Sequence, residues 1–205
     1  MRYRRGVESA GWGFSGVNLA LWLGAFALVV LVFWAVTHNR FVRLQNLLRE
    51  SWANVDVVLK RRYDLIPNLV ETVKGYAAHE KDVFEHVARA RELAVADVGP
   101  VAHQAQTEGE LVRSVNQLLA RVEAYPELKA SAHFTDLQRE LVNTEDRIAA
   151  ARRFYNANVR DFNLLLESFT TSMIGSGMGL KPQEFFEIEE LHLRAAPSVS
   201  ARPSS

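Results

Sequence analysis

The residue types in this sequence that bind metals or transfer protons are six histidines and 24 aspartates and glutamates. Their spacing does not assemble a metal site. A di-iron centre in a helical bundle needs a Glu-x-x-His pair on each of two helices, and the chain has one such pair, Glu189 and His192. His79 and Glu80 lack the second histidine of an H-E-x-x-H motif. We therefore expect neither a metal nor a cofactor.

The residue pattern does not contain a motif for nucleophilic catalysis either. The chain has no cysteine, and it contains neither a Gly-x-Ser-x-Gly nucleophile elbow nor a P-loop. Glu80 is the single candidate for acid–base work, because it falls on an apolar helical stripe between Tyr76 and Val83. One polar residue in a helical seam more often fixes register or partner, and we favour that role. We predict no enzymatic activity and no small-molecule substrate.

The candidates for binding an anionic partner are the cations Lys60, Arg61, Arg62, Arg152 and Arg153. Two roles are open for the first three. They could contact anionic lipid or an acidic partner, or they could pair within the chain with acidic residues of a neighbouring helix or of segment 184–190. We favour pairing within the chain. Without residues 1–36, which hold three arginines and one glutamate, 21 Lys and Arg stand against 23 Asp and Glu. This balance argues against nucleic acid as a partner.

Residues 17–36 contain no charged side chain. As a helix rising 1.5 Å per residue they span about 30 Å, the thickness of the hydrocarbon core of a bilayer. A cleaved signal peptide is the alternative, because Arg2, Arg4 and Arg5 precede the run. The run is longer than the apolar core of a usual signal peptide, and no small-residue cleavage site follows it. We predict an uncleaved, single-pass anchor.

Apolar residues at alternating spacings of three and four predict four helices after the anchor. The first helix continues straight out of the membrane as far as Pro67. A second begins near Leu65 and runs to Ala94, and a third ends at Pro126. Short connections between helices of similar length favour antiparallel neighbours.

The fourth helix has the most regular repeat, from Phe134 to Phe169, with Thr135 and Gln138 at capping-box spacing. Such a repeat favours coiled-coil-like packing. We predict an all-α fold in which a single N-terminal transmembrane helix is followed by a long antiparallel four-helix bundle and a short flexible C-terminal tail. The predicted divisions are residues 1–36 for the anchor, 37–168 for the bundle and 169–205 for the tail.

The stretch after Phe169 is rich in glycine and methionine, and then acidic and aromatic. It either folds back over an open end of the bundle or presents an exposed motif to a membrane or a second subunit. Because the repeat of the fourth helix is complete at Phe169, we predict that the bundle folds without the tail and that the tail carries an interaction. The candidate contact residues are Met173, Ile174, Met178, Phe185 and Phe186. The chain from Ala195 onwards is predicted to be disordered.

Residues 61–76, with the sequence RRYDLIPNLVETVKGY, resemble the central motif of the bacterial LemA family. Further segments match in the same order: AYPELK at 124–129, LQREL at 137–141, ARRFYN at 151–156 and FFE at 185–187. The resemblance covers roughly residues 38–190. It departs from the family at Thr170 and Leu180, where a proline and an aromatic residue are expected. It implies a membrane-anchored helical bundle, with a short N-terminus outside and the bundle in the cytoplasm, and it implies no reaction.

These observations favour a non-enzymatic scaffold in the cell (inner) membrane that forms homo-oligomers or organises other envelope proteins. Family members of magnetosome membranes suggest, by analogy alone, a role in membrane shaping. The alternative is an adaptor that binds a client protein or peptide at the membrane, for example beside a membrane protease.

Overall fold

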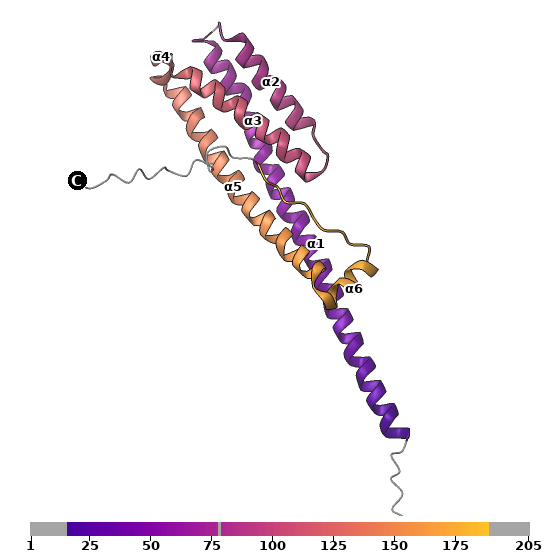
Figure 1. The fold of residues 1–205 in the computed structure, drawn as a ribbon. Coiled ribbons are helices and arrows are strands. Elements are labelled where there is room, and N and C mark those ends of the chain that lie inside the picture. Colours follow the sequence, from indigo (N-terminus) through magenta and orange to yellow (C-terminus); the bar gives the residue numbers. More distant parts are fainter. Residues whose placement is uncertain (1–15, 78, 189–205) are drawn as a thin grey trace, which may run out of the picture.

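The computed structural model describes residues 16–77 and 79–188, and the regular secondary structure in these ranges is helical throughout (Figure 1). The helices are α1 (Gly16–Lys74), α2 (Lys81–Ala96), α3 (Val101–Val122), α4 (Pro126–Lys129), α5 (Ala132–Glu167) and α6 (Phe169–Gly177). The predicted fold class is confirmed: an apolar N-terminal helix continues into an antiparallel bundle of α1, α2, α3 and α5.

Helix α1 is continuous over 59 residues, which is about 90 Å at 1.5 Å per residue. The predicted helix boundary at Pro67 is therefore wrong. A proline inside a helix removes the hydrogen bond to the carbonyl four residues earlier, here that of Tyr63. Arg91 Nε of α2 donates to this carbonyl oxygen at 2.7 Å. The freed acceptor is thus satisfied by a second helix, and α1 runs on to Lys74.

The predicted second helix is also corrected, because it does not run unbroken from Leu65 to Ala94. Its first part belongs to α1, and its second part is α2, after a turn that begins at Gly75. Two further corrections concern helix ends. Pro126 begins α4 and does not end α3. The N-cap of α5 is Ser131, whose Oγ accepts from Phe134 N at 3.4 Å, so the predicted capping box is wrong.

Residues 19–36 of α1 are not buried against any other helix in the described part of the chain. Among the described residues, α1 is the one helix long and apolar enough to cross a membrane, with a mean hydropathy of 2.6 in its most apolar window. Its large apolar side chains from Leu19 to Val36 are exposed. An exposed apolar face of this size is unfavourable in water and favourable in lipid. This part of α1 fits a single-pass membrane protein.

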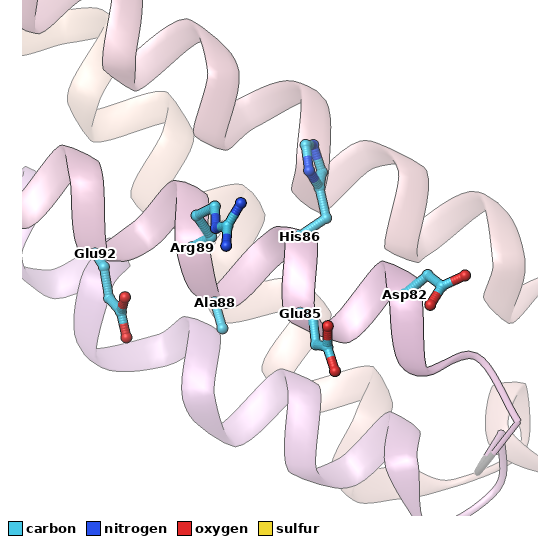
Figure 2. A pocket seen from close by; sticks show the side chains of 6 residues that line it. All are labelled: Asp82, Glu85, His86, Ala88, Arg89 and Glu92. Carbon is cyan, nitrogen blue, oxygen red and sulfur yellow. The ribbon is translucent and has the colours of Figure 1, made fainter.

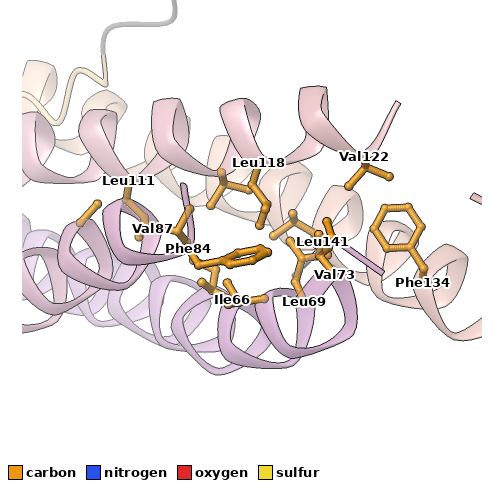
Figure 3. Close-up of a cluster of buried hydrophobic side chains, with 14 of the residues drawn as sticks. Ile66, Leu69, Val73, Phe84, Val87, Leu111, Leu118, Val122, Phe134 and Leu141 are labelled. Carbon is orange, nitrogen blue, oxygen red and sulfur yellow. The ribbon is translucent and has the colours of Figure 1, made fainter. Parts of the chain in front are cut away.

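Two apolar cores follow one another along α1. The distal core joins the end of α1 to α2, α3 and the start of α5 (Figure 3). It includes Ile66, Leu69, Val73, Phe84, Val87, Leu111, Leu118, Val122, Phe134 and Leu141. The proximal core, nearer residues 19–36, joins α1 to α5 from Ile148 onwards and also contains Ala105 of α3. It includes Phe41, Leu48, Val55, Leu59, Ile148, Tyr155, Val159, Phe162, Leu165, Leu166 and Phe186.

The stretch that we predicted to be flexible contains a helix, α6. Gly175 of α6 is buried, and a Cβ atom at this position would lie 2.5 Å from Leu166 Cδ1 and 3.1 Å from Phe41 Cζ. The glycine therefore allows α6 to pack closely against the proximal core. Gly179, with a φ of 69°, then reverses the chain.

Residues 180–188, here called the strap, run back along α1 and α5 in an extended conformation (yellow in Figure 1). The strap supplies Phe186 to the proximal core. The predicted division at residues 36 and 168 remains a prediction, although α1 crosses the first boundary without a break. The predicted disorder from Ala195 onwards lies outside the described residues.

Candidate functional site

The three consecutive cations on α1 lie in three different surroundings. Lys60 is exposed. Arg61 forms a solvent-exposed ion pair with Glu140 of α5 at 2.5 Å. Arg62 is 1% exposed. Successive residues of a helix point about 100° apart, so three neighbouring side chains face different surroundings. Arg61 and Arg62 therefore pair with acidic residues within the chain, which is the alternative that we favoured. Whether the group also contacts a partner remains a prediction.

Arg62 is the centre of a buried charged cluster that joins three helices. It forms ion pairs with Glu108 of α3 and with Glu145 of α5, the latter at 3.1 Å. The Tyr63 hydroxyl donates to Glu108. Burial raises the pKa of Tyr63, and the Arg62 charge opposes that rise in part, so the phenol remains a donor at neutral pH. The cluster lies between the distal and proximal cores, one helical turn from Leu59 and from Ile66.

This cluster is suited to holding the helices in register. Two buried opposite charges stabilise each other only in the correct alignment of α1 with α3. Arg62 also lines the groove between α3 and α5 that is described below. The sequence pattern did not reveal this role, because Glu108 comes from a distant part of the chain and only the fold brings it to Arg62.

Glu80 lies in the turn before α2 and not in a helical seam, so its predicted position is wrong. It is half-buried, and its carboxylate lies 3.8 Å from Arg121 Nε of α3. The stripe that suggested the seam is interrupted by the end of α1. Its role in association remains a prediction.

Two asparagines of α5 hold the strap. Asn163 Nδ2 donates to the Gln183 carbonyl at 2.9 Å, and Asn163 Oδ1 accepts from Gln183 N at 2.8 Å. Asn156 repeats this arrangement with the carbonyl and N–H of Phe186, at 3.1 and 2.9 Å. Seven helical residues rise about 10.5 Å and three extended residues span about 10 Å. The spacing of the asparagines therefore matches that of their strap partners.

Phe186 is the side chain that the strap buries. It is 0% exposed. The centroid of its ring lies 5.3 Å from that of Trp52, and the centroids of the Trp52 and Tyr155 rings are 5.1 Å apart. The Tyr155 hydroxyl donates to the Glu184 carbonyl at 3.1 Å. Burial, together with the Glu184 charge, raises the pKa of Tyr155. Phe186 thus packs in the proximal core, although the repeat of the fourth helix was expected to be complete at Phe169. That the bundle folds without the tail remains a prediction.

The other tail candidates differ in exposure. Met173 is exposed and Phe185 is 40% exposed, whereas Ile174 and Met178 pack against the proximal core. The tail therefore folds back, as one of the two alternatives had it, and leaves Met173 and Phe185 at the surface. An interaction through these two side chains remains a prediction.

A largely apolar groove of about 550 Å³ lies between α3 and α5. Its apolar lining includes Val112, Val115, Leu119, Leu141, Val142, Ile148 and, from the strap, Ile188. The lining also contains Arg113, Glu145, Asp146 and Arg152. Arg153, the other cation of that predicted pair, is exposed. The sequence pattern did not predict the groove.

A second hollow lies on the outer side of α2 and carries no convergent chemistry (Figure 2). Its lining residues are Asp82, Glu85, His86, Ala88, Arg89 and Glu92, all from one helix. Figure 2 shows His86 directed towards α3, where its Nε2 lies 3.3 Å from Glu110 Oε1. Glu85 and Glu92 extend to the other side. Within the described residues, no group of three or more His, Cys, Asp or Glu side chains is placed to hold a metal ion.

Comparison with known proteins finds relatives along most of the chain. The chain is similar to magnetosome protein MamQ of Magnetospirillum gryphiswaldense, at 24% identity over 196 residues that cover 83% of this chain and 72% of the relative. Against MamQ 2 of Paramagnetospirillum magneticum the identity is 25% over 175 residues, covering 73% of this chain and 64% of the relative. Protein LemA of Metamycoplasma hominis is 26% identical over 184 residues, which cover 86% of this chain and 82% of the relative.

The family assignment follows from a match over most of the chain. The model of the LemA family matches residues 51–200, a range that includes the Arg62 cluster, the groove and the strap. The chain belongs to the LemA family.

Proposed function

We propose that this protein is a non-enzymatic scaffold of the cell (inner) membrane, with its bundle in the cytoplasm, that self-associates or organises other envelope proteins. The observation that carries the proposal is the continuity of α1, which passes from the exposed apolar segment into both cores without a break. A partner bound to the bundle is therefore coupled to the membrane through one rigid helix. Two relatives are named as magnetosome proteins, which supports a role in membrane shaping.

Crosslinking in native membranes tests the scaffold. We expect a lysine- or acid-reactive reagent to join copies of this chain, or to join it to other envelope proteins, with Lys60, Met173 and Phe185 near the contact surface. Substitution of Met173 and Phe185 by serine should reduce the product and leave the helical content unchanged. Ile174→Ser is the comparison for lost packing, because Ile174 contacts the proximal core. A chain that remains monomeric and without neighbours in its native membrane would contradict the proposal.

Retention of the anchor is a separate prediction. We expect residues 17–36 to remain in the mature chain, because their apolar surface is continuous with a helix that the bundle needs. Extraction of membranes at alkaline pH should leave the protein in the pellet. N-terminal sequencing of the mature protein that begins near His38 would show a cleaved signal peptide instead.

An adaptor that binds a client peptide is the second candidate. The groove between α3 and α5 favours it, because apolar clefts of this size hold extended or helical peptide segments. In the crosslinking experiment, a single defined foreign protein attached near Val142 or Val112 would favour the adaptor over the scaffold.

A further inference from the structure

Helix α6 has one covered face and one open apolar face. Ile174 and Gly175 pack against the proximal core. Phe169 is 87% exposed and Met173 is 75% exposed, and two side chains four residues apart lie on the same face of a helix. Leu164, in the last turn of α5, is also exposed. A group of exposed apolar side chains marks a contact with a membrane or a protein.

The register of α1 against α5 places the start of α6 at the end of the apolar segment. The rings of Phe41 and Phe162 pack edge to face, with centroids 6.0 Å apart. Val36 lies five residues before Phe41, and Glu167, the last residue of α5, lies five residues after Phe162. Because the two helices are antiparallel, both positions are about 7.5 Å beyond the phenylalanine pair. Helix α5 therefore ends level with Val36, where the charge-free run of α1 also ends.

The other end of α6 is fixed at the level of Phe41. A Cβ atom on Gly175 would lie 3.1 Å from Phe41 Cζ, so α6 occupies the part of the bundle beside residues 36–41 of α1. Figure 1 shows α6 at the end of the bundle from which the apolar part of α1 emerges. The headgroup layer adds about 5–7.5 Å to each side of a hydrocarbon core. Helix α6 thus falls within the depth of that layer.

The chemistry of the segment suits this depth. Residues 168–180 contain no charged side chain. Three hydroxyl groups donate to backbone carbonyls of the same segment or of the end of α5: Ser168 to Leu164 at 2.7 Å, Thr171 to Ser168 at 3.2 Å and Ser172 to Phe169 at 2.9 Å. A hydroxyl group that already has an acceptor loses little when it leaves water. The open face of α6 can therefore enter lipid at low cost.

We propose that α6 lies in the interface of the bilayer that α1 crosses, with Phe169 and Met173 inserted at the boundary of the lipid chains. The partner of this face is the lipid surface, because the face is continuous in depth with the apolar segment of α1. Helix α6 then gives the bundle a second point of attachment, which restricts its tilt about α1. The inference rests on the anchor of the proposed function, and protein contacts through Lys60 or Phe185 remain compatible with it.

Quenching of a fluorescent label by lipid tests the inference in the full chain, which has no cysteine of its own. The label is attached at Thr170→Cys, an exposed position of α6 that keeps Phe169 and Met173. The protein is placed in vesicles of phosphatidylcholine and phosphatidylglycerol whose acyl chains carry a nitroxide near the headgroup. We expect a loss of fluorescence similar to that of a label at Phe33→Cys in the anchor, and an emission shift to shorter wavelength.

Phe154→Cys is the matched control for an exposed site of the bundle. Phe154 is 53% exposed and lies 13 residues before the end of α5, about 20 Å further from the membrane. Its label should show neither the loss nor the shift. Replacement of Phe169 and Met173 by aspartate should abolish the loss at Thr170→Cys and leave that at Phe33→Cys unchanged. Phe154→Asp should leave both unchanged.

The outcomes separate this inference from the anchor on which it rests. A label at Thr170→Cys that behaves like the one at Phe154→Cys, while Phe33→Cys is quenched, would overturn the inference and leave the anchor intact. A label at Phe33→Cys without quenching would overturn both. An emission shift at Thr170→Cys without quenching by lipid would assign the open face of α6 to a protein, such as a second copy of this chain, and would also overturn the inference.

Discussion

Replacement of Arg62 by methionine is expected to lower the free energy of unfolding of the bundle by about 3–5 kcal/mol, the usual loss when one partner of a buried ion pair is removed. The guanidinium of Arg62 faces Glu108 and Glu145 from inside the bundle. Without it, the buried Glu108 carboxyl group loses its ion-pair partner and retains the Tyr63 hydroxyl as a hydrogen-bond donor. Urea unfolding of the full chain in detergent, followed by circular dichroism, measures the loss.

Arg61→Met is the matched control, because the two arginines are adjacent on one helix. Arg61 and Glu140 are both about half exposed, and an exposed pair contributes at most about 1 kcal/mol. The double variant Arg62→Met/Glu108→Leu should recover part of the stability, since it removes both charges together. If the single replacements of Arg61 and Arg62 unfold at the same urea concentration, the buried cluster does not stabilise the bundle.

The apolar pattern predicted the helical content of this chain well. The 3–4 spacing of Ile66, Leu69 and Val73 identified a buried helix face, and all three are in the distal core. The charge-free run at 17–36 identified the segment of α1 that has no helix packed against it. Both signals come from residues within one helix, where spacing alone determines which side chains share a face.

The errors arose where contacts between distant segments override a local rule. Pro67 is a local signal for a helix boundary, but Arg91 satisfies the carbonyl that the proline leaves without a partner. Gly175 suggested a flexible chain, whereas it allows the close approach of α6 to Phe41. Neither contact is visible in the spacing of residues along one segment.

The contacts of the strap also could not be predicted from the spacing of residues along one helix. Asn156 and Asn163 are seven residues apart on the polar edge of α5 and bind the backbone of the strap at matching intervals. A repeat of one heptad between two asparagines was a readable signal in the sequence. It gained meaning only with the extended segment that follows Gly179, because a side-chain amide satisfies an N–H and a carbonyl of one extended residue at once.

Phe186→Ala is expected to destabilise the protein by about 3–5 kcal/mol, the usual range for removal of a fully buried phenylalanine. The substitution empties a position in the proximal core next to Trp52 and loosens the strap that Asn156 holds. Phe185→Ala is the control, because the neighbouring ring is partly exposed and its loss removes less buried surface. Urea unfolding of both variants in the full chain, with the fluorescence of Trp52 as a local probe in a variant whose other tryptophans are phenylalanine, measures the difference.

The comparison decides between the two alternatives for the tail. If the strap closes the proximal core in solution, Phe186→Ala shifts the unfolding midpoint much more than Phe185→Ala does, and the Trp52 emission moves to longer wavelength as water reaches the indole. Asn156→Ala should shift the midpoint in the same direction by a smaller amount, because two hydrogen bonds to the strap are lost. Equal and small losses for the two phenylalanines would mean that the bundle is stable without the strap, and that Phe186 is available to a membrane or a second subunit.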